Sequence, residues 1–251
     1  MKEGKPTENK SIITGRNPVM EALKSGREID KLIISKDAEG SIKKIVGMAK
    51  DKRITIQFVD KTVLDRLSDG GVHQGVAASI SPYSYYDVED ILAAAEAKNE
   101  DPFIIILDGI EDPHNLGAII RTAEGAGAHG IIIPKRRAVG VTETVVKASA
   151  GGVEYVPIAR VSNITQTIEK LKKSGIWVGA CHMDGTPYDE TNLKGSIALV
   201  IGGEGGGIGR LVKETCDFSV SIPMSGKINS LNASNAAAVL MYEVKRQRKG
   251  T

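Results

Sequence analysis

The sequence is poor in cysteine and in aromatic residues. Its 251 residues include two cysteines, Cys181 and Cys216, together with one tryptophan and three phenylalanines. The two cysteines stand far apart and no CxxC pair occurs, which argues against a disulfide framework and against a structural zinc site. We interpret both thiols as reduced, small core side chains of a cytoplasmic protein, and we predict no metal site.

Long apolar runs are also missing. No run approaches the ~18 residues that a membrane-spanning helix requires. The first ten residues are polar, without the apolar core of a secretion signal. We therefore expect neither a membrane segment nor export, and we expect these ten residues to be disordered.

Common nucleotide-binding motifs are absent as well. The sequence has no GxxxxGK(S/T), which excludes a P-loop kinase or GTPase on motif grounds, and it has no GxSxG. Residues 125–130 match GxGxxG, but a dinucleotide loop follows a strand and opens a helix, whereas here the helix-like stretch comes first. We interpret these glycines as a helix end. The isolated His114 and His182 are interpreted as hydrogen-bonding loop residues and not as catalytic bases.

The net charge of +2 is unevenly distributed. Residues 82–102 carry one basic and six acidic side chains, whereas residues 135–137 (Lys-Arg-Arg) and 245–249 are local basic clusters. Such clusters suit a phosphate backbone. Taken one at a time, solvated charges at loops and helix ends explain each cluster equally well.

The pattern of apolar residues predicts two α/β modules: a small one over 11–81, a linker over 82–102 with an acidic helix, and a larger module over 103–251. The small module is expected to have helices at 17–25, 42–49 and 61–67, and strands at 31–35, 54–59 and 72–80. Near-continuous Ile, Val and Leu runs in the larger module indicate strands buried on both faces, as in a parallel sheet. Its expected strands are 103–107, 130–134, 153–158, 176–181, 197–201 and 218–222, and its expected helices include 116–125, 162–173, 209–214 and 232–248.

Three polar, glycine-containing turns stand out in the larger module. They are residues 112–117 (Asp-Pro-His-Asn-Leu-Gly), residues 202–207 (Gly-Gly-Glu-Gly-Gly-Gly) and residues 222–232, each following an apolar run. Turns at the carboxyl ends of strands are where open α/β sheets build their sites. We therefore expect the functional site among these turns.

Each turn also has a purely structural interpretation. The glycines at 202–207 could form a flexible connection, although Glu204 inside such a loop favours a ligand-binding role. Asn115 could simply cap a helix, and Arg121 could pair with Glu124 on the helix surface. Arg121 lies near the edge of an apolar stripe, and a partly buried arginine usually has an anionic partner, so both interpretations of Arg121 stay open.

Taken together, these segments resemble the SpoU/TrmH family of the SPOUT methyltransferase superfamily. Residues 15–23 (Gly-Arg-Asn-Pro-Val-Met-Glu-Ala-Leu) resemble the opening of the substrate-binding domain in the branch that methylates a guanosine of large-subunit (23S) ribosomal RNA. Residues 108–124, 201–207 and 221–234 resemble the three family motifs, in order and with the family's spacing. One departure is Asn235, where the family usually has a small apolar residue.

The resemblance implies a ribose 2′-O-methyltransferase of RNA that uses S-adenosylmethionine. It also implies a C-terminal trefoil knot and a homodimer whose site is completed across the interface. The positions that match the family's catalytic residues are Arg121, Asn115, Glu124, Glu204, Ser230 and Asn232. Those that match its cofactor-binding residues are Gly202, Gly203, Ile222, Met224, Leu231 and Asn232.

The role of Arg121 is open within this resemblance. The family's arginine at this position is proposed to activate the ribose hydroxyl. Because a guanidinium stays protonated in proteins, we favour stabilisation of the developing alkoxide, or binding of a neighbouring phosphate, over a role as base.

The expected substrate is a guanosine of large-subunit ribosomal RNA. Residues 11–80 are expected to bind the RNA fold and residues 135–137 its phosphates. No DNA is expected, because the acceptor is the 2′-hydroxyl. The alternatives are a transfer-RNA 2′-O-methyltransferase of the same family and, from another class, a non-catalytic RNA-binding or ribosome-assembly factor.

Overall fold

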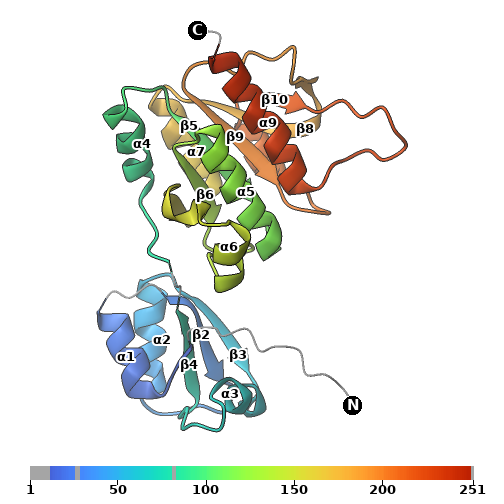
Figure 1. Ribbon diagram of the computed structural model, residues 1–251. Coiled ribbons are helices and arrows are strands. Elements are labelled where there is room, and N and C mark those ends of the chain that lie inside the picture. The colour runs from blue at the N-terminus through green and yellow to red at the C-terminus, as the bar shows by residue number, and fades with distance from the viewer. Residues whose placement is uncertain (1–11, 26–28, 81–82, 250–251) are drawn as a thin grey trace. The chain divides into compact units, whose positions relative to one another are not determined.

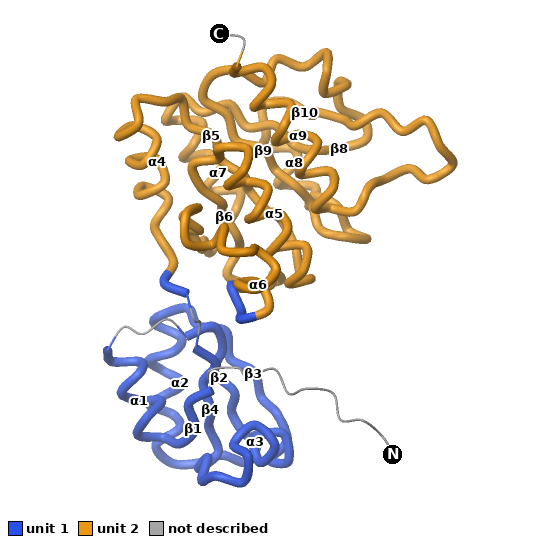
Figure 2. Tube along the Cα trace, in the orientation of Figure 1, with its two compact units in different colours: residues 1–84, 141–143 blue, residues 85–140, 144–251 orange. Residues whose placement is uncertain are grey.

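The computed structural model describes residues 12–25, 29–80 and 83–249. It divides the chain into two compact units, each with its own sheet (Figure 2). Unit 1 consists of residues 1–84 and 141–143, and unit 2 of residues 85–140 and 144–251. In the described part of the chain, no helix is long and apolar enough to cross a membrane.

Unit 1 is a sheet with helices on both faces. Its elements are β1 (Ile12–Thr14), α1 (Arg16–Lys24), β2 (Ile29–Ser35), α2 (Ile42–Asp51), β3 (Thr55–Val59), α3 (Lys61–Leu67) and β4 (Val76–Ile80). The strand order is β1-β4-β2-β3, with β2 and β3 parallel and β4 antiparallel to both its neighbours. Side chains alternate along β2, so Leu32 and Ile34 pack with α1 and α2, whereas Ile33 packs with Leu64 of α3.

Two details of unit 1 differ from the sequence pattern. The short β1 was not predicted. The strand expected at 72–80 begins at Val76, because Gln74 and Gly75 have positive φ angles of 51° and 81° and turn the chain. The prediction of disorder for the first ten residues lies outside the described residues.

The sheet of unit 2 has six parallel strands in the order β10-β8-β9-β5-β6-β7 (Figure 1). They are β5 (Phe103–Asp108), β6 (Gly130–Pro134), β7 (Ile158–Val161), β8 (Trp177–Pro187), β9 (Ile197–Gly202) and β10 (Phe218–Ser221). Residues 103–107 of the central β5 are at most 1% exposed. The continuous apolar run at 103–107 thus belongs to a strand covered on both faces, as predicted.

Helices cover both faces of this sheet. They are α4 (Val88–Ala97), α5 (Pro113–Ala126), α6 (Glu143–Ala148), α7 (Ile164–Lys173), α8 (Arg210–Thr215) and α9 (Ala233–Arg248), with a short 3-10 helix at Gly152–Glu154. Ile104 and Ile106 of β5 face the core that α4, α7 and α8 complete. The intervening Ile105 and Leu107 face the opposite side, where α5 and α9 pack against each other.

The two units match the predicted fold class, a parallel-sheet α/β domain with a smaller N-terminal α/β domain. The trefoil knot stays a prediction. The expected strand at 153–158 is wrong. Gly151 has a φ of 89° and Gly152 lies close to the backbone of α5, so this stretch forms a turn with Val153 and Val156 buried, and β7 begins at Ile158.

The structure also assigns most of the expected linker, residues 82–102, to unit 2. Its acidic helix is α4, which begins with a capping box between Asp87 and Asp90. Ile91 of α4 is fully buried in the unit 2 core. A residue packed in this way makes the helix part of the domain that it covers.

Candidate active site

The three turns singled out in the sequence follow β5, β9 and β10. β5 and β9 are parallel neighbours, and Asp108 pairs with Gly202 where both strands end. The turn after β5 leads into α5, and the segment after β10 leads into α9. Because α5 and α9 pack against each other, their first turns lie beside the glycine-rich turn at residues 202–207.

One side chain from each turn joins a hydrogen-bonded triangle. Asn115 Nδ2 donates to Glu204 Oε1 at 2.9 Å, and Asn232 Nδ2 donates to the same oxygen at 2.5 Å and to Asn115 Oδ1 at 3.0 Å. Asn115 is only 7% exposed. Two amide groups therefore fix the carboxylate of Glu204, and the triangle ties the three turns to one another.

Helix capping explains only part of this arrangement. Asp112 caps α5, since its Oδ1 accepts the N–H of His114 at 2.9 Å, so the capping interpretation of Asn115 is wrong. Asn232 does cap α9, because its Oδ1 accepts the N–H of Ser234 at 2.9 Å. Its Nδ2 remains available for the triangle, so Asn232 belongs to both the helix end and the site.

The glycine-rich turn is packed tightly against the end of β5. The N–H of Gly203 donates to the backbone oxygen of Asp108 at 2.9 Å, and the N–H of Gly209 donates to Asp108 Oδ2 at 2.8 Å. A Cβ on residue 203 would collide with the carbonyl oxygen of Gly109. Glycine is required for this approach, so the turn is a defined wall and not a flexible connection.

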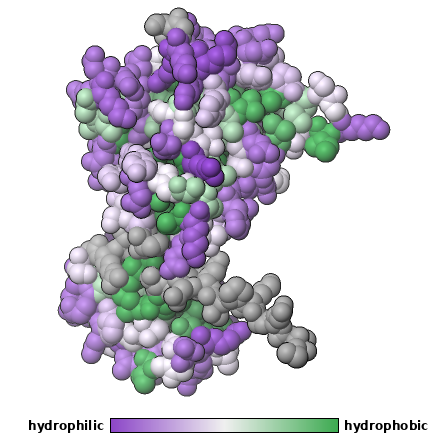
Figure 3. Space-filling view, viewed as in Figure 1, coloured by the Kyte–Doolittle hydropathy of each residue, from purple (hydrophilic) through white to green (hydrophobic). Residues whose placement is uncertain are grey.

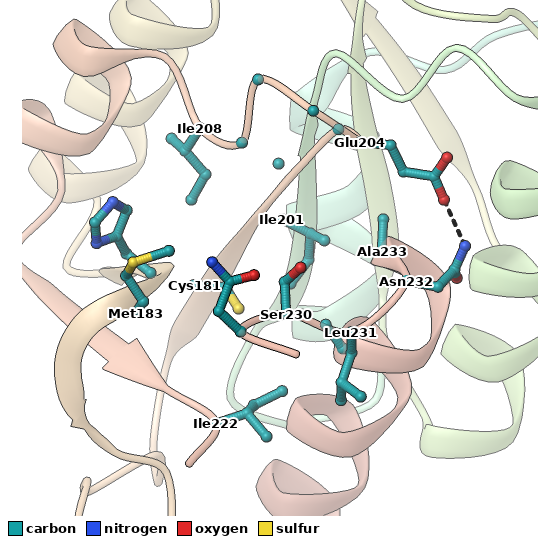
Figure 4. A pocket seen from close by; sticks show the side chains of 18 of the residues that line it. Cys181, Met183, Ile201, Glu204, Ile208, Ile222, Ser230, Leu231, Asn232 and Ala233 are labelled. Atoms are coloured by element: carbon teal, nitrogen blue, oxygen red, sulfur yellow. Dashed lines mark hydrogen bonds between the residues drawn. The ribbon is translucent and has the colours of Figure 1, made fainter. Parts of the chain in front are cut away.

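The glycine-rich turn and the segment after β10, together with β8, line a pocket of about 580 Å³ beside the triangle (Figure 4). It is lined by residues 181–183, 201–208, 222, 224, 229–233 and 236. Its volume lies in the range of roughly 300–1,000 Å³ that small-molecule sites occupy. Ile201, Ile222 and Leu231 offer apolar surface for a flat ring, and the glycine-rich turn offers unshielded backbone. This combination fits S-adenosylmethionine, which has an adenine ring and a polar amino-acid end.

The predicted site residues divide into two groups. Those that line the pocket are Gly202, Gly203, Glu204, Ile222, Met224, Ser230, Leu231 and Asn232. Asn115 joins them through the triangle. Arg121 and Glu124 do not line the pocket and are exposed on α5.

Helix geometry explains the separation of Arg121. It lies six residues after Asn115, which corresponds to about 9 Å along the helix and about 120° around it. The described residues show no ion pair between Arg121 and Glu124. Gly152 lies against the backbone of Arg121, so this part of α5 is covered on one side while the guanidinium remains exposed.

The pocket residues that sequence reasoning missed include Cys181, His182 and Met183 of β8. Burial raises the pKa of the Cys181 thiol to about 11, so this side chain lines the pocket as an apolar group. His182 was expected in a loop but lies on the strand. The only signal that could have found these residues is the position of β8 next to β9, which a single sequence does not reveal.

Two family descriptions match the chain. Residues 102–242 match the SpoU rRNA methylase family, and residues 12–86 match the RNA 2′-O ribose methyltransferase substrate-binding domain. The chain belongs to the SpoU methylase family. It is an S-adenosylmethionine-dependent RNA 2′-O-methyltransferase with a substrate-binding domain before its catalytic domain.

Relatives of this methyltransferase match either nearly its whole length or about two thirds of it. YacO of Bacillus subtilis, named as a TrmH family tRNA/rRNA methyltransferase, is 51% identical over 94% of this chain and 95% of its own. An rRNA methyltransferase of Sinorhizobium meliloti with bound S-adenosylmethionine is 26% identical with a TM-score of 0.59, covering 94% of this chain and 86% of its own. The TrmH/SpoU tRNA-modifying enzyme of A. aeolicus is 25% identical with a TM-score of 0.55, over 64% of this chain and 84% of its own.

Proposed function

We propose that this methyltransferase modifies the ribose 2′-hydroxyl of a guanosine in large-subunit ribosomal RNA, in the cytoplasm, as a knotted homodimer. The observation that carries the proposal is the Asn115–Glu204–Asn232 triangle at the edge of the pocket. It brings residues from all three motifs to one side of a space that suits the cofactor.

The main contribution of the protein to the reaction is to position the two reacting groups. The bound cofactor supplies an activated methyl group on a sulfonium. The protein must hold the ribose hydroxyl in line with that methyl and support the loss of its proton, and such positioning contributes much of the rate. We assign the positioning to Ser230, Glu204 and Asn232 at the pocket wall, and the stabilisation of the developing alkoxide to Arg121.

A second copy of the chain would bring Arg121 to the pocket. Within one chain Arg121 lies on an exposed face of α5, about two helical turns from the triangle. Apolar residues gather beside α9 and the loop that precedes it (Figure 3). In the loop, Met224, Ile228 and Leu231 are 37, 72 and 39% exposed, and Tyr242 of α9 is 51% exposed. Such a surface favours a subunit interface that includes α9 and its neighbour α5.

Basic side chains support RNA as the substrate. Arg136 and Arg137 are exposed in the loop after β6. This loop is joined to the turn after β5, because the N–H of Val139 donates to the backbone oxygen of Ile110 at 2.8 Å. The loop therefore lies at the same edge of the sheet as the site, where it can bind phosphates next to the modified ribose.

The share of this chain that each relative matches favours ribosomal over transfer RNA as the substrate. The rRNA methyltransferase of S. meliloti matches 94% of this chain, whereas the tRNA-modifying enzyme of A. aeolicus matches 64%. Residues 15–23 resemble the ribosomal branch in addition. A tRNA substrate is the alternative, because YacO is named for both RNA classes.

The deciding experiment is transfer of labelled methyl groups to total RNA and assembling ribosomal particles that lack native modifications, followed by size separation and nucleotide mapping. We expect label on the ribose of one guanosine of large-subunit ribosomal RNA. Label on transfer RNA would replace the substrate. No label on any RNA, with normal cofactor binding, would favour a non-catalytic RNA-binding factor. Arg121→Ala should abolish transfer and keep cofactor affinity. Arg210→Ala, at a side chain 91% exposed on α8, is the control and should keep both transfer and cofactor affinity.

A further inference from the structure

β8 carries a histidine to the pocket wall that lies across from the triangle. Cys181, His182 and Met183 line the pocket from β8. In Figure 4, Met183 lies on the opposite side of the pocket from Glu204 and Asn232. The thiol and thioether beside it are weak hydrogen-bonding groups, so His182 is the side chain of this β8 stretch that can form a directed hydrogen bond.

Two donors determine which ring nitrogen of His182 carries the hydrogen. Lys213 Nζ on α8 lies 2.9 Å from Nδ1, and the backbone N–H of Asp184 points at the same atom at 3.2 Å. An ammonium and a backbone N–H can only donate, so Nδ1 accepts and the hydrogen is on Nε2.

The carboxylate of Asp184 does not reverse this assignment. Its Oδ2 also lies 3.2 Å from Nδ1 and could accept a hydrogen from it. Such a hydrogen would face the ammonium of Lys213 at the shorter distance, and the N–H of Asp184 would lose its acceptor. Oδ2 instead has Lys213 Nζ at 3.5 Å.

The arrangement leaves Nε2–H without a protein partner among the described residues. The His182 side chain is 28% exposed, so the donor is open to whatever enters the pocket. Sites for small molecules are mostly apolar, with a few placed polar groups that fix the orientation of the ligand. The His182 ring is held at Nδ1 by Lys213 of α8, and its Nε2–H is open to the pocket. It therefore has the properties of such a polar group.

We propose that His182 binds S-adenosylmethionine by donating Nε2–H to one of its acceptor atoms, and that Lys213 positions the ring for this contact. The inference rests on the pocket being the cofactor site, as under Proposed function. The cofactor has acceptors of two kinds, the oxygens of its carboxylate and the nitrogens and oxygens of its adenosyl part. His182 is thus a cofactor-binding residue and Lys213 a positioning residue.

Calorimetric titration of the full-length chain with S-adenosylhomocysteine tests the contact. His182→Leu removes the donor and should weaken binding about five- to tenfold, whereas His182→Gln keeps an N–H donor and should restore most of the affinity. Lys213→Met should weaken binding less than His182→Leu, and Lys213→Arg should restore it. Lys173→Met, at an exposed lysine of α7, is the matched control and should have no effect.

Two further measurements locate the contact and separate the inference from its premise. Methylthioadenosine has no carboxylate. In a titration with this ligand, His182→Leu should lower the affinity only if Nε2–H binds the adenosyl part. Nitrogen-15 NMR should find the hydrogen on Nε2, with a shift on ligand addition. Leu231→Asp tests the pocket itself: if it leaves binding unchanged, the pocket is not the cofactor site. If Leu231→Asp abolishes binding and His182→Leu does not weaken it, the role of His182 is overturned.

Discussion

At the scale of single residues, Asn232 contributes to both the fold and the site, through different atoms of its side-chain amide. Its Oδ1 caps α9 by accepting the N–H of Ser234 at 2.9 Å, and its Nδ2 donates to Glu204 and Asn115. The two functions use different atoms. A substitution that changes only the nitrogen can therefore separate stability from activity.

Asn232→Asp is that substitution. The aspartate keeps an oxygen at the cap of α9, where negative charge is favourable, but it places a second carboxylate against Glu204. We expect the free energy of unfolding to stay within about 1 kcal/mol of wild type and methyl transfer to fall about 100-fold. Asn232→Ala should in addition lose about 1 kcal/mol of stability. Urea denaturation and single-turnover methyl transfer measure both, and a wild-type rate for Asn232→Asp would show that the amide is dispensable.

The two thiols give a pH prediction. Burial raises the pKa of both Cys181 and Cys216 from 9.0 to about 11. Because the thiolate is the reactive form, alkylation by iodoacetamide should be slow near neutral pH and should accelerate as pH approaches 11. Stability changes in the opposite direction to reactivity. Because each thiol ionises more easily in the unfolded chain, the folded state loses stability as the pH rises from 9 towards 11.

Mass spectrometry after timed alkylation measures the extent of modification of each cysteine separately. S-adenosylhomocysteine should slow the reaction of Cys181, which lines the pocket, and leave Cys216, which does not, unchanged. Cys216 is thus the internal control. Equal reactivity of Cys181 with and without ligand would argue that the ligand binds elsewhere.

At the scale of elements, the glycine-rich turn depends on position and not on glycine content alone. A Cβ at Gly203 would collide with the Gly109 carbonyl, whereas a Cβ at Gly206 meets no atom within 4 Å. We expect Gly203→Ala to weaken S-adenosylhomocysteine binding about tenfold or more by displacing the wall of the pocket. Gly206→Ala should bind within about twofold of wild type. Calorimetry compares them, and equal affinities would contradict the proposed wall.

The sequence predicted elements where local pattern and burial agree. The apolar runs of β5, β6 and β9 lie where expected, because strands covered on both faces need no alternation. The prediction of a strand failed at Val153 and Val156, because the same residue types can be buried in a turn against a helix. The position of His182 at the pocket could not be predicted, because it depends on the order of the strands in the sheet.

Helix α4 tests the boundary between the units. Ile91 is fully buried in the unit 2 core, where Gly130 lies directly against it. If α4 belongs to that unit, Ile91→Ala should lower the free energy of unfolding by about 2–5 kcal/mol. Glu89→Ala on the exposed side of the same helix should change it by less than about 0.5 kcal/mol. Thermal and urea denaturation of the full chain measure both, and a neutral Ile91→Ala would restore the linker interpretation.

At the scale of the whole molecule, the proposed site is divided between two surfaces. The pocket and the triangle lie at the start of α9, and Arg121 lies on an exposed part of α5. If one chain supplies the pocket and its partner supplies Arg121, a defect in each surface can be placed on a different chain. If one chain contains the whole site, every defective chain stays defective in any mixture.

Mixed dimers distinguish these cases. Arg121→Ala keeps the pocket and loses the arginine, whereas Asn232→Asp loses the triangle and keeps the arginine. Each variant alone should be nearly inactive. Co-expressed with two different tags and purified through both, the mixed dimer should contain one complete site out of two and should regain about half of the wild-type rate, because a two-fold interface gives two equivalent sites. A mixed dimer as inactive as its parents would show that Arg121 acts within its own chain, and α5 would then have to move during the reaction.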